Sequence, residues 1–210
     1  MTKHEWKRTE KEIYMPKNKP EIIKVPNFKF FTLSGEGNPN SEGFADAIGV
    51  LYSLAYCIKM MPKKGKTPQG YFDYTVYPLE GIWDLNDEAK AKGIMDKDSL
   101  VYKIMIRQPD FVTAELAEEA LKMVKKSKPH SLLEEVAFEI IEDGQCVQML
   151  HVGSYDSEPE SFTKMEEFCA ENKLVRESKT HREIYLSDAR KTAPDKLNTV
   201  LRFKVEKIKL

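Results

Sequence analysis

The sequence predicts an α+β protein made of antiparallel strands with helices on one side of the sheet. Apolar residues alternate in several runs and recur with a helical period in others, and the order strand, helix, strand, strand occurs twice. The 210 residues, 41% hydrophobic and 10% aromatic, can bury a sizeable core. We therefore expect two strand–helix–strand–strand modules in a pseudo-twofold arrangement, with a ligand cleft between the modules.

The first module is expected to follow a polar N-terminal arm over residues 1–20. A β-rich run at 21–35 predicts a strand. Ser41 is a candidate N-cap for a helix over 42–61, and an apolar face supports that helix through Phe44, Ile48, Leu51, Ala55 and Ile58.

An aromatic strand is predicted over 71–85, with Pro78 placing it at a sheet edge or a bulge near Glu80. A polar connection over 86–98 leads to an alternating strand over 99–108. Thr113 then caps a helix over 114–127, which links half-modules at about 21–108 and 134–208 within one domain, 21–210.

The second module is predicted to open with a hairpin. Residues 134–142 alternate, Asp143-Gly144 is a hairpin turn signal, and 145–153 return as the second strand. Ser157 and Glu160 form a capping box for the next helix. Strands over 181–188 and near 201–206 complete the module.

Charge and composition narrow the function classes. The net charge of −1 argues against direct nucleic-acid binding, and no apolar run reaches the roughly 20 residues of a membrane span. The charged N-terminus lacks a signal core, so a cytoplasmic protein is expected. The three cysteines and four histidines show no metal-ligand spacing, and no nucleotide-binding loop is present, so we expect neither a metal nor a cofactor.

Glu183 lies in the run HREIYLSD, which reads as a strand. Ile184 and Leu186 then point to one face, and His181, Glu183 and Tyr185 point to the other. A solvated glutamate in a half-exposed strand is the ordinary explanation of such a residue. A second run of similar build, YPLEGIWDL, carries Glu80 and Trp83 and favours a functional role for both glutamates.

Four separated stretches resemble the stand-alone GyrI-like small-molecule-binding family. They are DYTVYPLEGIW, MIRQPDFVTAEL, VQMLHVGSYDSEPESFTKMEEFC and HREIYLSDARKTAPDKLNTVLRFKV, in this order from about residue 20 to 205. The resemblance implies the same two-module fold. It also implies an aromatic or cationic lipophilic small-molecule ligand, and in some members hydrolytic opening of cyclopropane-bearing DNA-alkylating toxins.

The resemblance transfers specific roles to this chain. Glu183 and Glu80 become candidate bases, and Tyr155 or Tyr185 becomes the donor to the developing oxyanion. Two glutamates facing one apolar cleft would raise each other's pKa, so one could donate a proton. The candidate ligand-binding residues are Trp83, Tyr185, Tyr71, Phe138, Tyr102 and His151, with Tyr102 standing where the resemblance leads us to expect a tryptophan.

Two alternatives remain at this point. The same glutamate among aromatic rings suits a non-catalytic binder of planar or cationic drugs through charge and cation–π contact. The second alternative is a protein that acts by binding another protein and so affects DNA gyrase. A sheet histidine with satisfied hydrogen bonds is the ordinary explanation of His151, and a monomer and a homodimer are both compatible with the sequence.

Overall fold

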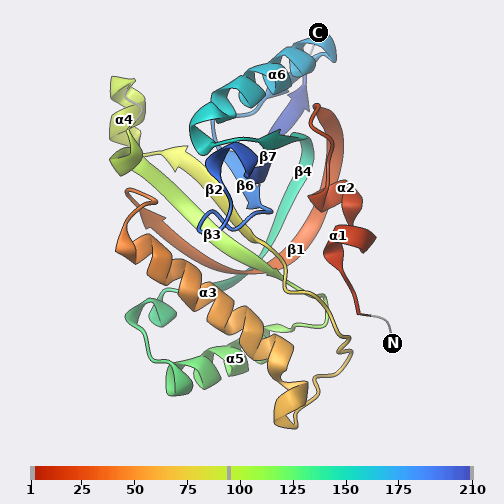
Figure 1. Cartoon of the computed structure of the whole chain (residues 1–210), viewed down its shortest axis with the longest axis vertical. Helices are drawn as coiled ribbons and strands as arrows, with labels where there is room; N and C mark the ends of the chain where they lie inside the picture. Colours follow the sequence, from red (N-terminus) through yellow and green to blue (C-terminus); the bar gives the residue numbers. More distant parts are fainter. Residues whose placement is uncertain (1–2, 94–95, 209–210) are drawn as a thin grey trace. The chain divides into compact units, whose positions relative to one another are not determined.

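The computed structural model describes residues 3–93 and 96–208 and confirms the α+β class. Positions 1–2, 94–95 and 209–210 lie outside the described residues. The first two residues of the predicted arm, the last two residues of the predicted domain and two positions of the 86–98 connection are therefore not described. The helices and strands, in chain order, are α1 Trp6–Thr9, α2 Lys11–Tyr14, β1 Glu21–Glu36, α3 Glu42–Met60, β2 Leu79–Leu85, α4 Asp87–Lys92, β3 Leu100–Gln108, α5 Ala114–Ser127, β4 Ala137–Val152, α6 Glu158–Glu171, β5 Leu174–Arg176, β6 His181–Tyr185 and β7 Asn198–Lys207 (Figure 1).

The chain forms two compact units. Among the described residues, the first contains 3–5, 28–79 and 85–141 without 94–95, and the second contains 6–27, 80–84 and 142–208. The predicted element order is confirmed except at one place, since β1, α3, β2 and β3 are followed by α5 and then by β4, α6, β6 and β7, with the single strand β4 where two strands were predicted. The short β5 is an addition that the sequence did not indicate.

In the first unit, β1 pairs antiparallel with β3, and Leu33 faces Ile104 across the pair. Helix α3 packs against β3 and α5, and Figure 1 shows α3 and α5 side by side. Ser41 caps α3 by accepting from the Phe44 amide, as predicted. By length and composition α3 could also cross a membrane, with a mean hydropathy of 1.2, and 44% of that stretch is buried inside the structure.

In the second unit, β7 pairs antiparallel with β4, β5 and β6, and β6 pairs antiparallel with β2. Helix α6 lies beside β5 (Figure 1). Its apolar face packs on the sheet in a core of Val147, Met149, Met165, Cys169, Leu174, Leu201, Phe203 and Val205. This packing positions the start of α6 near β6, which matters for the site below.

Several local predictions were wrong. Part of the predicted arm forms the short helices α1 and α2, and the polar connection contains α4. The aromatic strand over 71–85 is regular only from Leu79, because residues 71–78 are irregular apart from one bridge at Tyr74.

The predicted Asp143-Gly144 hairpin does not form, and β4 continues through it as one strand. Gly144 takes φ +70°, a conformation that lets a strand deform locally without ending. The Asp143 carboxylate binds Arg182 at 2.8 Å instead of capping a turn.

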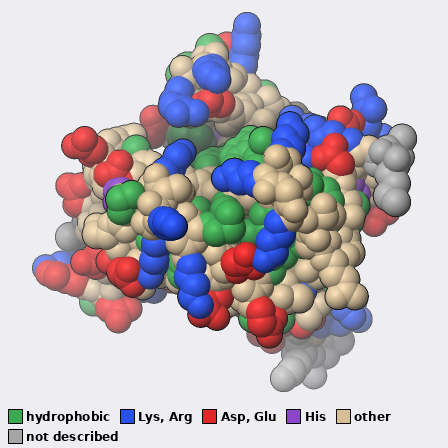
Figure 2. All heavy atoms as spheres, turned by 90° about the horizontal axis from the view of Figure 1, so that it is seen from below, with side chains coloured by type: hydrophobic (Ala, Val, Ile, Leu, Met, Phe, Trp, Pro, Cys, Tyr) green, Lys and Arg blue, Asp and Glu red, His purple; other side chains and the backbone are tan. Residues whose placement is uncertain are grey.

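Lysine and arginine side chains lie among aspartates and glutamates on the molecular face drawn in Figure 2, with hydrophobic side chains between them. This mixture agrees with the balanced composition of 33 basic and 34 acidic residues. The face drawn therefore carries no single-sign field of the kind that attracts a polyanion.

Candidate functional site

Glu183 lies on the face of β6 that looks toward α6, as its strand register shows. It pairs with Gly81 on β2 and with Leu201 on β7, and paired residues in an antiparallel sheet point to the same side. Leu201 belongs to the core under α6. The Glu183 residue is only 8% exposed, so it is a buried carboxyl and the solvated explanation does not hold.

Trp83 and Tyr185 lie beside Glu183 on this face. The indole Nε1–H of Trp83 donates to the Tyr185 hydroxyl at 2.8 Å. Because an indole can only donate, the Tyr185 proton is available for Glu183, with which Tyr185 also hydrogen-bonds. Burial and the neighbouring Glu183 charge raise the pKa of Tyr185 well above its usual value of 10.0.

Gly81 makes this arrangement possible. A Cβ at this position would lie 2.6 Å from Trp83 Nε1, closer than side-chain atoms can approach. The indole therefore folds back over the glycine backbone to reach Tyr185. The glycine of the sequence run LEGIW thus has a packing function that its sequence context did not reveal.

His181 supplies a further donor to Glu183. Its Nε2 lies 3.0 Å from Glu183 Oε1, and its ring packs edge-on against Phe162 of α6 with the ring centroids 4.8 Å apart. A Nε2–H tautomer donates to the carboxylate and holds it in one orientation.

Glu158, the first residue of α6, is the second carboxyl of the site. It is 7% exposed and hydrogen-bonds with Glu183. Burial, the Glu183 charge and this hydrogen bond raise the pKa of Glu158 to about 10. Its Oε1 is buried and meets no donor among the described residues, which a neutral acid tolerates better than a carboxylate. Glu158 is therefore held in its neutral, protonated form at neutral pH.

Sequence reasoning missed Glu158. The predicted capping box drew attention to Ser157 and Glu160, but the Ser157 side chain makes no cap hydrogen bond and instead donates to the Ser154 carbonyl at 2.7 Å. The sequence offered only a glutamate at the start of a predicted helix. Acidic residues are common there because the helix dipole favours them, so the position did not indicate a site.

Tyr155 is the accessible member of the cluster. It is 40% exposed, and its ring meets that of Tyr185 edge-on with centroids 6.1 Å apart. Burial of its hydroxyl and the nearby Glu183 and Glu158 charges raise its pKa to about 12. At neutral pH its hydroxyl is protonated and close enough to the carboxyl pair for their charges to act on it.

His151 holds the segment that carries Tyr155 and Glu158. Its Nδ1 lies 2.9 Å from the Ser161 hydroxyl and its Nε2 lies 3.0 Å from the Ser154 carbonyl oxygen. Since Nε2 must then be the protonated nitrogen, it donates to the carbonyl and Nδ1 accepts from Ser161. His151 is a buried histidine with both nitrogens satisfied, and its predicted role in ligand binding remains a prediction.

Glu80 does not share this cluster, and the expectation that both glutamates face one cleft is wrong. Glu80 pairs with Ile184, the residue after Glu183, so its side chain points to the opposite face of the sheet. There Arg182 donates to it at 2.8 Å and Tyr14 lies at 3.4 Å. Arg182 also binds Asp143, so Glu80 belongs to a buried ion network.

The other predicted aromatic residues lie in the first unit. Phe138 packs on Phe31 at a centroid distance of 5.4 Å, and Tyr102 meets Phe44 edge-on at 4.9 Å. Tyr71 packs against Phe111 at 5.3 Å. Each has a partner ring within its own unit, and their predicted contact with a ligand stays a prediction.

Comparison with known families gives a match over residues 18–206 to the GyrI-like small molecule binding domain. The chain belongs to this GyrI-like family. Its domain type therefore indicates a small-molecule ligand, in agreement with the resemblance found in the sequence. No match was found among curated proteins.

Solved structures give close relatives of the GyrI-like chain. A protein described as a hydrolase from Listeria innocua is 37% identical with a TM-score of 0.88, covering 97% of this chain and 100% of its own. A conserved protein of Listeria innocua described as uncharacterized is 40% identical, with the same coverage and TM-score. The EcmrR C-terminal domain is 14% identical with a TM-score of 0.53, covers 90% of this chain and 98% of its own, and shares the fold.

Proposed function

We propose that this GyrI-like protein is a hydrolase that opens an activated cyclopropane ring in electrophilic, lipophilic small molecules and so detoxifies them. The observation that carries the proposal is the buried contact between Glu183 and protonated Glu158, close to the Tyr155 and Tyr185 hydroxyls. A base and a proton donor side by side are what addition of water to such a ring requires. The 37% identity to a protein described as a hydrolase supports the enzymatic assignment.

In the proposed reaction Glu183 takes a proton from a water molecule, and the water oxygen forms a bond to a ring carbon. The cyclopropane carbon–carbon bond breaks, and its electron pair moves through the conjugated system to the substrate carbonyl oxygen. Tyr155 donates its proton to that oxygen, and the proton on Glu183 returns to Tyr155 through solvent. The substrate gains one water, and the enzyme is unchanged.

The neighbours of Glu183 hold it ready for this step. His181 and Tyr185 donate to it, and neutral Glu158 hydrogen-bonds with it. A fixed base needs little reorganisation when the substrate reacts. Trp83 anchors Tyr185, and the rings of Tyr155 and Tyr185 offer apolar surface to a flat substrate.

Incubation with a cyclopropane-bearing duocarmycin-type compound, followed by mass spectrometry, tests the proposal. The wild-type protein should convert the compound to a product heavier by one water. Glu183→Gln should bind the compound and lose turnover by a factor of about 10²–10⁴, the usual contribution of a general base. Wild-type turnover in this variant would remove Glu183 from the mechanism.

Two matched variants act as controls. Glu167→Gln makes the same change at an exposed position of α6 and should leave turnover unchanged. Glu80→Gln changes the other candidate base, which binds Arg182 on the opposite face of the sheet. The folded fraction of this variant should therefore still convert the compound. If folded Glu80→Gln lost turnover and Glu183→Gln kept it, Glu80 and not Glu183 would be the general base.

A second candidate function is a binding protein without chemistry. The negative charge shared by Glu183 and Glu158, next to the Trp83, Tyr155 and Tyr185 rings, also suits a planar cation. Unchanged compound together with a saturable change in tryptophan fluorescence would support this function. In that case Glu183→Gln should weaken binding.

A further inference from the structure

Helix α3 carries a stripe of exposed and half-buried residues along its outward side. Successive members of the stripe are three or four residues apart, a spacing that places them along one side of a helix. The stripe begins at the first residue of α3 and ends in the turn Pro62–Lys64 that follows the helix. Its members, called here the α3 stripe, are Glu42, Ala45, Gly49, Tyr52, Tyr56, Met60 and Lys63. Between its two ends the stripe is uncharged, although charged residues make up 32% of the chain.

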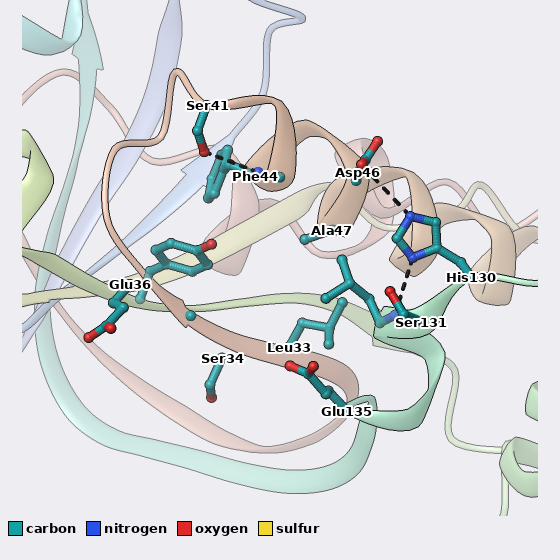
Figure 3. A pocket seen from close by; sticks show the side chains of 14 residues that line it. Leu33, Ser34, Glu36, Ser41, Phe44, Asp46, Ala47, His130, Ser131 and Glu135 are labelled. Atoms are coloured by element: carbon teal, nitrogen blue, oxygen red, sulfur yellow. Dashed lines mark hydrogen bonds and ion pairs between the residues drawn. The ribbon is translucent and has the colours of Figure 1, made fainter.

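The other sides of α3 have partners within the first unit. Asp46, at one edge of the stripe, lies beside His130 with 3.8 Å between the carboxylate and Nε2, at the margin of the hollow drawn in Figure 3. Lys59, at the other edge, binds Asp73 and lies 5.2 Å from the centre of the Tyr74 ring. The helix residues buried in the unit are Phe44, Ala47, Val50, Leu51, Leu54, Ala55, Cys57 and Ile58.

The stripe has small residues in its first half and large residues in its second half. Tyr56 is 52% exposed, and its ring centroid lies 6.3 Å from that of Tyr52. Gly49, one turn before Tyr52, leaves a gap in the surface, because a Cβ there would meet no atom within 4 Å. Ala45 comes one turn earlier and is also exposed. The helix therefore presents a groove next to an aromatic ridge, which is the form that helix packing uses.

The stripe is complementary in shape to a second copy of itself turned end for end. With a twofold axis beside Tyr52, Tyr56 of each copy lies over Gly49 of the other, and Met60 lies over Ala45. The two Tyr52 rings meet at the axis. A twofold interface requires this reciprocity, since each residue must meet the same partner in both directions. Large residues thus fill the gaps left by small ones along the whole stripe.

The charges at the two ends of the stripe select the same antiparallel orientation. Glu42 lies at the start of α3 and Lys63 lies just beyond its end. Antiparallel copies bring Glu42 of each copy to Lys63 of the other, so the dimer has two such pairs. Parallel copies would place Glu42 against Glu42 and Lys63 against Lys63, which repel each other. Charge complementarity therefore favours a second copy of this chain as the partner.

We propose that the protein forms a homodimer through the α3 stripe, with the two α3 helices antiparallel and about 8–10 Å apart. Tyrosines dominate the centre of the contact, as they do in many protein interfaces. A single pair of helices buries less surface than a standard interface, so the dissociation constant should be about 10–100 µM. The dimer uses residues of the first unit and does not involve the Glu183 cluster.

Sedimentation equilibrium of the full chain tests the proposal. The mass should rise with concentration from 24.2 kDa to twice that value. Gly49→Glu places a charged side chain where Tyr56 of the second copy packs and should raise the dissociation constant at least tenfold. Gly43→Glu makes the same change on another side of α3, also in open space, and should leave the dimer intact. Both variants replace a helical glycine by a better helix former, so both should fold.

Exchange of the two end charges tests the orientation. Glu42→Lys and Lys63→Glu should each raise the dissociation constant about tenfold, because two attractive pairs become repulsive. The double variant restores both pairs and should return to within about threefold of the wild type. A loss of folding or of local structure would not be repaired in this way. Failure of the double variant to recover would refute the antiparallel register.

Three results would overturn the dimer itself. The first is a wild-type protein that stays at 24.2 kDa up to about 1 mM. The second is a dimer that Gly49→Glu leaves unchanged, because another surface would then hold it together. The third is a monomeric protein that co-sediments with phosphatidylcholine vesicles, since lipid would then cover the α3 stripe.

Discussion

Replacing Glu158 by glutamine should stabilise the protein above neutral pH and should reduce the pH dependence of its free energy of unfolding. The folded state holds this carboxyl protonated, with a pKa of about 10 against an ordinary value of 4.5. The unfolded chain therefore carries fewer protons than the folded chain between these two values. Stability from this group is complete below about pH 4.5 and is lost as the pH rises toward 10.

The magnitude follows from the shift. Each pH unit between the two pKa values costs about 1.4 kcal/mol for one group. At pH 7 the free energy of unfolding of the wild-type protein is therefore about 3 kcal/mol lower than in acid because of this group. This figure is an upper limit because Glu158 titrates together with Glu183. Glutamine has the shape of the neutral acid and does not titrate, so Glu158→Gln should recover most of that loss.

Urea unfolding at a series of pH values from 5 to 9 measures this effect. The two proteins should be nearly equal in stability at pH 5 and should diverge steadily as the pH rises, with Glu158→Gln the more stable. Glu167→Gln, an exposed change on the same helix, should follow the wild-type curve. Parallel curves for wild type and Glu158→Gln across this range would refute the protonated state of Glu158.

Two further variants examine the packing around the cluster. Arg182→Leu leaves the buried Glu80 carboxylate without its guanidinium partner and leaves Asp143 with Arg202 alone, at 3.6 Å. It should lower the free energy of unfolding by about 3–5 kcal/mol, measured by urea unfolding. A smaller loss than 1 kcal/mol would mean that water replaces the ion pairs. Gly81→Ala places a Cβ 2.6 Å from Trp83 Nε1 and should cost about 1–3 kcal/mol as an overpacked site, with a changed tryptophan fluorescence spectrum. An unchanged spectrum and stability would show that the indole does not lie over Gly81.

Local sequence signals determined most of the secondary structure. The helical period and the cap of α5 at Thr113 predicted its bounds, because helix formation depends on residues three and four apart. The alternation of β3, β6 and β7 predicted those strands for a similar reason. The separated family motifs also indicated the fold correctly, since they report on the whole chain at once.

The sequence also singled out Glu183, Tyr155, Tyr185 and Trp83, which the structure brings together. Trp83 and Tyr185 are far apart in the chain, and only the pairing of β2 with β6 makes their hydrogen bond possible. Periodicity could assign a face to each residue of one strand. It could not say which residues of another strand share that face.

Tertiary structure alone decided which glutamates form the pair. Strand register places Glu80 one residue away from the position opposite Glu183, and a shift of one residue reverses the face. Packing of α6 on the sheet brings Glu158 to Glu183 instead, and burial beside the Glu183 charge then keeps Glu158 protonated. The sequence by itself determined most of the elements, the family and Glu183 as a candidate, whereas the burial of Glu183, the second carboxyl and its protonation depend on long-range packing and desolvation, which no local pattern records.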